Sequence, residues 1–198
     1  MNLRISRAAL LGAMILVVLG SEIKGAEAAG PPYALGSCND VTLGTFTTAE
    51  CAVATDSGTV GVMAYSAVVG AAAARAQAST TGNFNYSGYY TISCPINYVA
   101  KFSKTFWAWA TLHANLFVDG VKYTDDNLGA DGVWPWEMRS IWQLWSAPRN
   151  RSYTITRTLY LGRGSHTFYC GLEDRVSTGW WDQYAAMVAV GDVTRITW

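Results

Sequence analysis

SHTFYCGL, from Ser165 to Leu172, is the stretch that decides the fold, because apolar residues occupy alternate positions along it. Side chains of a β-strand point alternately to its two faces. One face of this segment therefore carries Phe168, Cys170 and Leu172, and His166 lies on the same face. A strand with one such face covers an apolar core on that side, so the segment predicts a half-buried strand.

A second segment, SGYYTISC from Ser87 to Cys94, alternates in the same way, and a tyrosine and an isoleucine share the face of its cysteine. Two cysteines on the apolar faces of strands can meet across a core, so we predict a disulfide bond between Cys94 and Cys170. Cys38 and Cys51 flank a Thr-rich segment without such a face, and we expect them to pair with each other. An even cysteine count in an exported chain favours disulfides over thiol chemistry or zinc binding.

Further segments of strand-like composition recur along the chain, with turn residues between them. These segments are Thr59 to Val69, Phe106 to Val118, Tyr153 to Leu161, Gln183 to Val190 and Val193 to Trp198. The turn signals are Asp119-Gly120, Asn127-Leu128-Gly129, Gly162-Arg163-Gly164 and Gly191-Asp192. Residues 59–79 are rich in alanine and leave a helix or a membrane span as alternatives to a buried strand. Short strands at this spacing predict an all-β fold, an antiparallel β-sandwich of the jelly-roll or immunoglobulin-like kind.

The order of cysteines and tryptophans resembles the Cys…Trp…Cys layout of immunoglobulin domains. Trp107 and Trp109 follow Cys94 by 13 and 15 residues, and GSHTFYC ends on Cys170. This resemblance implies a sandwich with a bond between its sheets. The tyrosine that such domains place two residues before the second cysteine is replaced by Phe168, and a jelly-roll sandwich is an equal alternative.

The N-terminal residues have the pattern of a cleavable secretory signal. Arg4 and Arg7 precede an uncharged apolar run, and small residues in an A-x-A pattern follow at Ala26-Glu27-Ala28. The run is shorter than the roughly 20 residues that span a bilayer, so a retained membrane anchor is the lesser alternative. We therefore expect a signal peptide at residues 1–28, one secreted, extracellular domain at residues 29–198, and no membrane contact after cleavage.

The charge of the chain is low and balanced, with 14 basic and 14 acidic residues. Phosphate binding needs a basic excess or a basic stripe, and neither is present, so nucleic acid is not an expected partner. A weakly charged, aromatic-rich exterior instead indicates contact with carbohydrate or with another extracellular protein, including a second copy of this chain. No cofactor is indicated.

The segment from Phe106 to Val118 has two different faces. The residues at even positions are all apolar and predict a core face. The opposite face carries Trp107, Trp109, His113 and Asn115, which combine flat rings with hydrogen-bonding groups about 6.5 to 7 Å apart along a strand. Sugars offer C–H faces for aromatic rings and hydroxyls for polar groups, so these residues are candidate glycan ligands. The competing hypothesis is that a loop or a second sheet covers these rings.

A long loop rich in tryptophan is expected between Tyr123 and Ala147. Trp134 and Trp136 are two residues apart, hence on one face if the chain is extended, and Pro135 between them argues against a central strand. Long ordered loops on β scaffolds often carry binding, which adds this tryptophan pair to the candidate ligand-binding residues. Filling of the core is the alternative role for these rings.

Metal binding and catalysis have weak signals. The stretch DDNLGADG, Asp125 to Gly132, offers oxygen ligands of the kind that calcium prefers, but it lacks the helix-loop-helix calcium pattern and is equally a solvated turn. No nucleophile or zinc motif occurs. A glycosidase pair could be drawn only by combining acidic residues freely among Asp131, Glu137, Glu173, Asp174 and Asp182. We therefore expect no metal site and no enzyme activity.

These observations leave two principal hypotheses and one weaker one. The first is a secreted, non-catalytic binding module, with carbohydrate as its ligand on an aromatic platform. The second is an extracellular or cell-surface structural subunit that assembles with copies of itself. A glycoside hydrolase is the third.

Overall fold

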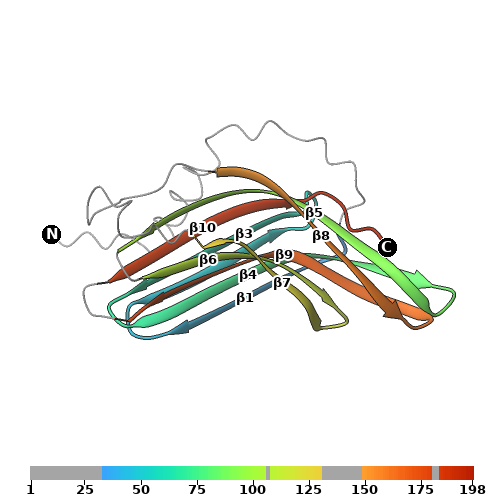
Figure 1. Cartoon of the computed structure of the whole chain (residues 1–198), viewed down its shortest axis with the longest axis horizontal. Helices are drawn as coiled ribbons and strands as arrows, with labels where there is room; N and C mark the ends of the chain where they lie inside the picture. Colours follow the sequence, from blue (N-terminus) through green and yellow to red (C-terminus); the bar gives the residue numbers. More distant parts are fainter. Residues whose placement is uncertain (1–32, 106–107, 131–148, 180–182) are drawn as a thin grey trace.

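The computed structural model describes residues 33–105, 108–130, 149–179 and 183–198. This part of the chain is built from ten β-strands, most of them long (Figure 1). In chain order they are β1 (Leu35–Leu43), β2 (Thr47–Ala54), β3 (Thr59–Ala67), β4 (Gly70–Phe84), β5 (Gly88–Lys104), β6 (Trp109–Val118), β7 (Val121–Ala130), β8 (Arg149–Leu161), β9 (Gly164–Thr178) and β10 (Tyr184–Val193).

The strands form two five-stranded sheets that pack face to face (Figure 1). One sheet has the order β1-β4-β9-β6-β7 and the other the order β2-β3-β10-β5-β8. Every neighbouring pair is antiparallel. The predicted all-β antiparallel sandwich is therefore confirmed.

Strands β3 to β10 wind between the sheets as a jelly roll. Four of them, β3-β10-β5-β8, make one layer, and the other four, β4-β9-β6-β7, make the second, so that successive strands mostly alternate between layers. Strand β2 adds to the first layer beside β3, and β1 adds to the second beside β4. This winding decides for the jelly roll and against the immunoglobulin arrangement.

The core between the sheets follows the alternation in the sequence. In β9, Phe168, Cys170 and Leu172 are buried, as are Ile92 and Cys94 in β5. The even-numbered residues of β6, from Ala110 to Val118, are all buried as well, and Ala108 just before the strand joins them. Burial of these apolar side chains is the main source of stability, at roughly 25 cal/mol per Å² removed from water.

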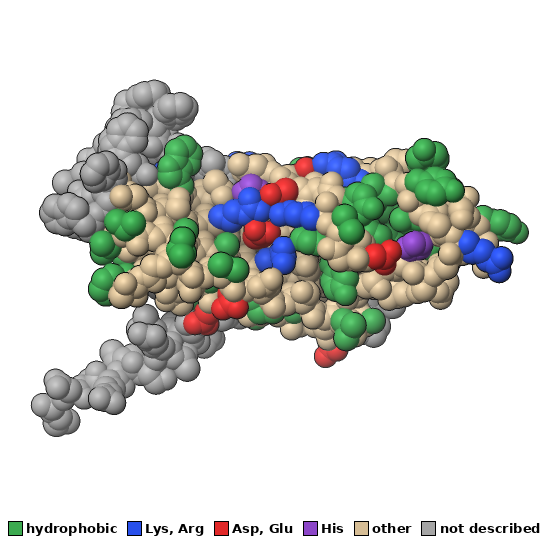
Figure 2. Space-filling model, turned by 90° about the horizontal axis from the view of Figure 1, so that it is seen from below, with side chains coloured by type: hydrophobic (Ala, Val, Ile, Leu, Met, Phe, Trp, Pro, Cys, Tyr) green, Lys and Arg blue, Asp and Glu red, His purple; other side chains and the backbone are tan. Residues whose placement is uncertain are grey.

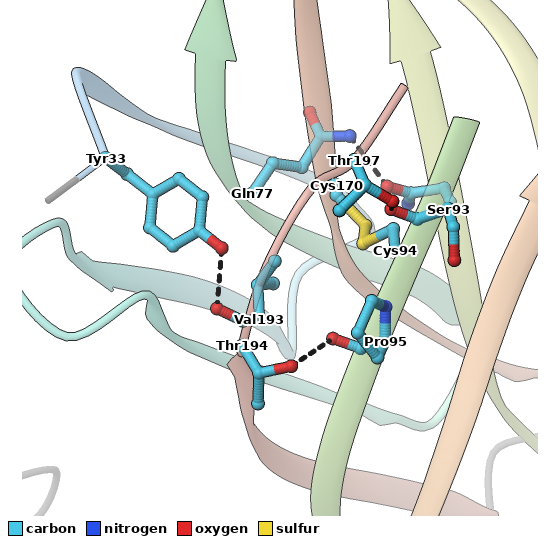
Figure 3. The surroundings of a disulfide bond; sticks show 10 residues. Tyr33, Gln77, Ser93, Cys94, Pro95, Cys170, Val193, Thr194 and Thr197 are labelled. Atoms are coloured by element: carbon cyan, nitrogen blue, oxygen red, sulfur yellow. Dashed lines mark hydrogen bonds between the residues drawn. A yellow bond between two sulfur atoms is a disulfide. The ribbon is translucent and has the colours of Figure 1, made fainter. Parts of the chain in front are cut away.

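Both predicted disulfides are present. Cys94 in β5 is bonded to Cys170 in β9, so this bond joins the two sheets through the middle of the core (Figure 3). Cys38 in β1 is bonded to Cys51 in β2 and joins the sheets again at their edge.

Two side-chain hydrogen bonds also hold the chain near the Cys94–Cys170 disulfide (Figure 3). The Tyr33 hydroxyl donates to the Val193 carbonyl at 2.9 Å, and the Thr194 hydroxyl donates to the Pro95 carbonyl at 3.5 Å. Burial raises the pKa of Tyr33 to about 12, so this hydroxyl keeps the proton that it donates.

The alanine-rich residues 59–79 are strand, in agreement with the favoured prediction, but they form parts of two strands rather than one. Strands β3 and β4 meet at a tight turn in which Val68 has a φ of 69°, an unusual value for a β-branched residue. The alanines at even positions of β4 are buried against the opposite sheet. The helix and membrane-span alternatives are therefore excluded.

Two predicted turns are wrong. Asn127-Leu128-Gly129 lies inside β7, and Gly191-Asp192 lies inside β10. A side chain at Gly191 would bring its Cβ to 2.9 Å from Leu172 of the other sheet, so glycine is needed here for close approach of the sheets rather than for a turn. Asp192 accepts a hydrogen bond from the Thr59 hydroxyl at 2.8 Å on the neighbouring strand.

Other expectations fall partly or wholly outside the described residues. Residues 123–130 of the predicted Trp-rich loop are instead part of β7, and residues 131–148 lie outside the described residues. The predicted signal peptide, residues 1–28, also lies outside the described part. Within that part, no helix is long and apolar enough to cross a membrane.

Candidate binding surface on the outer face of one sheet

The outward side chains of β6 lie on the outer face of the β1-β4-β9-β6-β7 sheet. This sheet is the lower layer in Figure 1, and Figure 2 shows its outer face from below, with a group of charged side chains near the middle and hydrophobic side chains on both sides of this group. Registered strand pairs divide this face into rows that cross the sheet. The rows show how the predicted ligand-binding residues are placed.

Trp109 begins the first row and is 62% exposed. Its neighbours across the sheet are Ser177 in β9, then Ala71 in β4 and Leu43 in β1. Since serine and alanine are small, these two neighbours on the β9 side leave the space above the sheet to the indole. The next row brings two polar side chains beside it, Thr111 and Arg175. Trp109 is thus an open ring with hydrogen-bonding groups at its side.

Asn115 lies farther along β6 and is fully buried although it is on the outer face. Its Oδ1 accepts a hydrogen bond from Gln77 Nε2 at 2.6 Å, and its Nδ2 donates to Glu173 Oε2 at 3.3 Å. Both ends of the amide are occupied by protein partners. Asn115 therefore positions its neighbours and offers no surface to a ligand in this conformation.

His113 is nearly as enclosed, with 9% exposure. Its Nε2 lies 3.1 Å from the Thr111 hydroxyl, and its Nδ1 lies 3.2 Å from Asp125 Oδ1. Burial, followed by the nearby positive charge of Arg175, lowers the pKa of His113 despite the opposing effect of Asp125. The ring is therefore predominantly neutral at pH 7, and its Nε2 holds the Thr111 hydroxyl in the neighbouring row.

Ion pairs surround these two side chains and make a continuous polar network. The network comprises Arg75, Gln77, His113, Asn115, Lys122, Asp125, Glu173 and Arg175. Arg175 is its centre: Nη2 donates to both oxygens of Asp125, at 3.0 and 2.8 Å, and Nε donates to Glu173 Oε1 at 2.7 Å. Such charge-assisted bonds are the stronger kind, and they hold the guanidinium toward the rows of His113 and Asn115, in which Glu173 and Asp125 lie.

The two carboxylates of the network stay charged. Burial acts to raise the pKa of Asp125 and of Glu173, but a hydrogen bond from Arg175 lowers it in both cases; a hydrogen bond from Lys122 adds to this at Asp125, and the positive charges of Arg175 and Lys122 add to it at Glu173. The same ion pairs raise the pKa of Arg175, although burial opposes this. Exposed pairs of this kind contribute little stability one by one, so the main effect of the network is to hold its side chains in place.

An aromatic ring closes the far end of the network. The Arg75 guanidinium lies 4.7 Å from the centre of the Phe117 ring, and the Lys122 ammonium lies 5.8 Å from it. Both distances are within the range of a cation–π contact. The Phe117 ring is therefore engaged by two cations, whereas the Trp109 ring is open.

Of the predicted ligand-binding residues, the structure describes three: Trp109, which is exposed, and His113 and Asn115, which are buried in the network. Trp107, Trp134 and Trp136 lie outside the described residues. Sequence reasoning missed the partners from other strands, chiefly Arg175 and Glu173. Their spacing of two residues, on the face opposite Cys170 and Leu172, was the available signal, because it places two charges on one face of a predicted strand.

The acidic candidates for calcium or for a glycosidase are separated by the same alternation. Asp125 belongs to the outer network, while Asp126 faces the other way and accepts hydrogen bonds from Tyr153 at 2.8 Å and Arg157 at 2.6 Å. Glu173 is on the outer face, and Asp174 is buried in the core. Among the described residues, no group of three or more His, Cys, Asp or Glu side chains could hold a metal ion. The other acidic candidates, Asp131, Glu137 and Asp182, are not described.

Comparison with known proteins gives no match in sequence. Neither a protein family nor a curated protein matches this chain. Among solved structures, a family 35 carbohydrate-binding module from an environmental isolate is 13% identical, with a TM-score of 0.24, covering 67% of this chain and 68% of its own. A module of the same family from Paenibacillus barcinonensis is 15% identical, with a TM-score of 0.24, covering 81% and 98%.

A third solved structure, the enzymatically active domain of tailspike protein 4 from bacteriophage CBA120, is 9% identical. Its TM-score is 0.30, and the match covers 78% of this chain and 19% of the tailspike chain. All three TM-scores are low, so the function of this chain has to be inferred from its own residues.

Proposed function

We propose that the protein is a secreted, non-catalytic carbohydrate-binding module that binds a glycan on the outer face of the β1-β4-β9-β6-β7 sheet. The observation that carries this proposal is Trp109, an exposed indole on a strand with the small residues Ser177 and Ala71 in its row and with Thr111 and Arg175 in the next row. A flat ring next to fixed hydrogen-bonding groups suits the C–H face and the hydroxyls of a sugar.

The network beneath this surface supports the same function by preorganisation. Arg175 is already held by two carboxylates, so little side-chain conformational entropy is lost when it binds a sugar hydroxyl. Asn115 and His113 act in this proposal as positioning residues, and Thr111 takes the place of His113 as a ligand-contacting residue. Trp107, Trp134 and Trp136 stay predictions as further contacts.

The test is affinity electrophoresis of the mature chain in gels that contain soluble polysaccharides, for wild type, Trp109→Phe and Trp109→Ala. We expect retardation to fall in that order, with at least about tenfold weaker binding for the alanine variant, because an exposed aromatic anchor dominates such surfaces. Because Trp109 is largely exposed, both variants should keep the wild-type melting temperature.

The matched control is Tyr123→Ala, which removes another exposed ring from the far end of the same sheet. This variant should migrate like wild type in every gel. Equal retardation of wild type and Trp109→Ala in all gels, or no retardation of wild type in any, would contradict the proposal.

A second candidate function, self-assembly, is favoured by a different observation. Leu43 at the end of β1, Phe46 in the β1–β2 turn and Val69 in the β3–β4 turn are all exposed at one end of the sandwich. Among the described strands, β1 is also an edge strand of its sheet, a feature that promotes pairing between copies. Light scattering at tens of micromolar tests this alternative: a monomer there rules it out.

A further inference from the structure

The second sheet carries a different surface along its outer edge, on the ribbon formed by β5 and the edge strand β8. Ile92, Cys94 and Ile155 of these strands face the core, so the residues next to them in sequence face outward. The outward residues form five cross-strand pairs, which we call the hydroxyl ribbon: Tyr89/Tyr160, Thr91/Thr158, Ser93/Thr156, Pro95/Thr154 and Asn97/Ser152. None of these ten side chains carries a charge.

Two open aromatic rings stand at one end of the hydroxyl ribbon. Tyr89 is 78% exposed and Tyr160 is 62% exposed. Their ring centres are 5.4 Å apart with the planes at 72°, so the pair is held edge to face and still offers ring surface to the outside. Exposed aromatic rings on a rigid strand pair are a place for a ligand with an apolar face.

Hydroxyl groups continue from these rings along both strands. The Thr91 and Thr158 hydroxyls are 2.9 Å apart, which fixes the first pair after the tyrosines. Along β8 the hydroxyls of Thr154, Thr156 and Thr158 are exposed and repeat every second residue, about 6.6 to 7 Å apart. Each can donate one hydrogen bond and accept others, so the array complements a chain of hydroxyl groups.

The ribbon is rigid before any ligand binds. β5 and β8 pair without a register shift from Gly88 to Ala100, and Cys94, on the underside of β5, is bonded to Cys170 of the other sheet. The Arg157 guanidinium, next to Thr156 and Thr158 in sequence, binds Asp126 and Thr124 of the opposite sheet. Its charge is therefore directed away from the ribbon.

We propose that the hydroxyl ribbon is a second binding surface, specific for a neutral polysaccharide chain that lies along β5 and β8 with its apolar faces on Tyr89 and Tyr160. The lack of charge on the ribbon favours a neutral ligand over an acidic one. Its small apolar area beyond the two rings disfavours a protein partner, since the centre of a protein interface is more apolar. This inference does not depend on glycan binding at Trp109, which is on the opposite sheet.

The experiment measures depletion of the mature chain from solution by four insoluble neutral polymers: cellulose, chitin, granular starch and β-1,3-glucan. The parent chain carries Trp109→Ala, which removes the candidate ring of the first surface. The variants in this parent are Tyr89→Ala with Tyr160→Ala, and, separately, Thr156→Glu, which places a charge in the middle of the ribbon. Tyr65→Ala is the matched control, because Tyr65 is an exposed tyrosine on β3 of the same sheet outside the ribbon.

We expect the parent to bind at least one polymer, the tyrosine double variant to bind it at least tenfold more weakly, and Thr156→Glu to weaken binding as well. Tyr65→Ala should bind like the parent. The proposal is overturned if the parent binds none of the four polymers, or if both ribbon variants bind as the parent does. Melting temperatures show whether each variant is folded. If the tyrosine double variant does not fold, the binding of Thr156→Glu alone tests the proposal.

The two proposals fail separately in this design. If Trp109→Ala abolishes binding that the wild type shows, the second surface is refuted while the first stands. If Trp109→Ala has no effect and the ribbon variants abolish binding, the first surface is refuted and the second stands.

Discussion

The side-chain amides of Gln77 and Asn115 meet at 2.6 Å above Gly171, the residue that both face in the register of β9. A Cβ at Gly171 would collide with the backbone of Ala76 and Gln77, so only glycine lets β4 and β9 approach this closely. Two buried amides from strands far apart in sequence are thereby paired on the outer face of a sheet.

The pairing makes each amide dependent on the other. Gln77→Ala should leave Asn115 Oδ1 without its donor and lower the free energy of unfolding by about 1 to 3 kcal/mol, the range for an unsatisfied buried polar group. Urea denaturation measures this. Asn39→Ala, at an exposed position of β1 on the same face, is the control and should change the value by less than about 0.5 kcal/mol. Equal changes in the free energy of unfolding for the two substitutions would show that the hydrogen bond between Gln77 and Asn115 adds no stability.

The two histidines should titrate on opposite sides of the ordinary histidine value. His166 Nδ1 is 2.6 Å from Asp119 Oδ2 and its Nε2 is 2.9 Å from the Gly162 carbonyl, and these hydrogen bonds raise the pKa of His166. Burial lowers the pKa of His113. Because the chain has only these two histidines, their ring signals in an NMR titration are easily assigned. His166→Gln assigns them, and the reverse order of midpoints would contradict the structure.

The same shifts predict opposite contributions to stability. A raised pKa in the folded state means that His166 stabilises the protein fully below its unfolded pKa of about 6.5, and that this contribution is lost as the pH rises through the folded value. For His113, stability is lost as the pH falls below about 6.5 through its lowered pKa. Unfolding free energies of wild type and His166→Gln should therefore converge between neutral pH and mildly alkaline pH.

Asp174 should make the protein less stable at higher pH. The carboxyl is buried between the sheets, Oδ1 accepts a hydrogen bond from the Ala74 amide at 3.0 Å, and Oδ2 has no side-chain hydrogen bond among the described residues. Burial raises the pKa of Asp174 well above its usual range, so the folded state holds a proton that the unfolded state releases above about pH 4. Stability from this group is therefore present at low pH and declines as the pH rises.

The test for Asp174 is Asp174→Asn, which replaces the carboxyl with a neutral amide of the same shape. Relative to wild type, the variant should gain stability between pH 5 and pH 8 in urea denaturation. A difference between the two chains that is constant over this pH range would contradict the assignment. Asp40→Asn, at an exposed site on β1, controls for the loss of one negative charge.

The two disulfides should contribute unequally. The Cys94–Cys170 bond spans 76 residues and the Cys38–Cys51 bond spans 13. In the chain-entropy account, loops of these lengths correspond to about 4.5 and about 3 kcal/mol. Cys94→Ala with Cys170→Ala should therefore lower the melting temperature more than Cys38→Ser with Cys51→Ser. Thermal unfolding of the two double variants decides, and the opposite order would overturn the expectation.

The part of the fold that the sequence predicts is the part in which one face is apolar. Alternation around Cys94 and Cys170 was sufficient to assign both strands, the side of each strand that faces the core, and the disulfide between them. A slip of one residue would move every side chain to the wrong face. Strands β1 and β2 were not predicted, because their polar, largely exposed residues carry no such pattern. Gly191-Asp192 was misread as a turn because a glycine required by sheet packing looks the same in sequence as one required by a turn.

The candidate surface was less predictable than the core for a similar reason. The sequence identifies which residues of β6 face away from the core, but it does not show which strands lie beside β6. Arg175 and Gln77 come from β9 and β4, and their contacts with Asp125 and Asn115 depend on the order of strands in the sheet. Trp109 is exposed beside the small side chains of Ser177 and Ala71, whereas His113 and Asn115 are buried among the longer side chains of the polar network.

A sandwich holds its two outer faces on opposite sides of one core, and here Trp109 lies on one of them and Tyr89 and Tyr160 on the other. A single straight stretch of polymer cannot contact both. A protein that binds one polysaccharide segment on each face is therefore a bivalent cross-linker, and two linked sites of this kind gain avidity without any new contact. Added to a dilute polysaccharide solution, such a protein would raise the viscosity until the ratio of protein to polysaccharide reaches an optimum. With protein in excess the viscosity would fall again, because each protein molecule then binds a single polysaccharide chain and cross-links none.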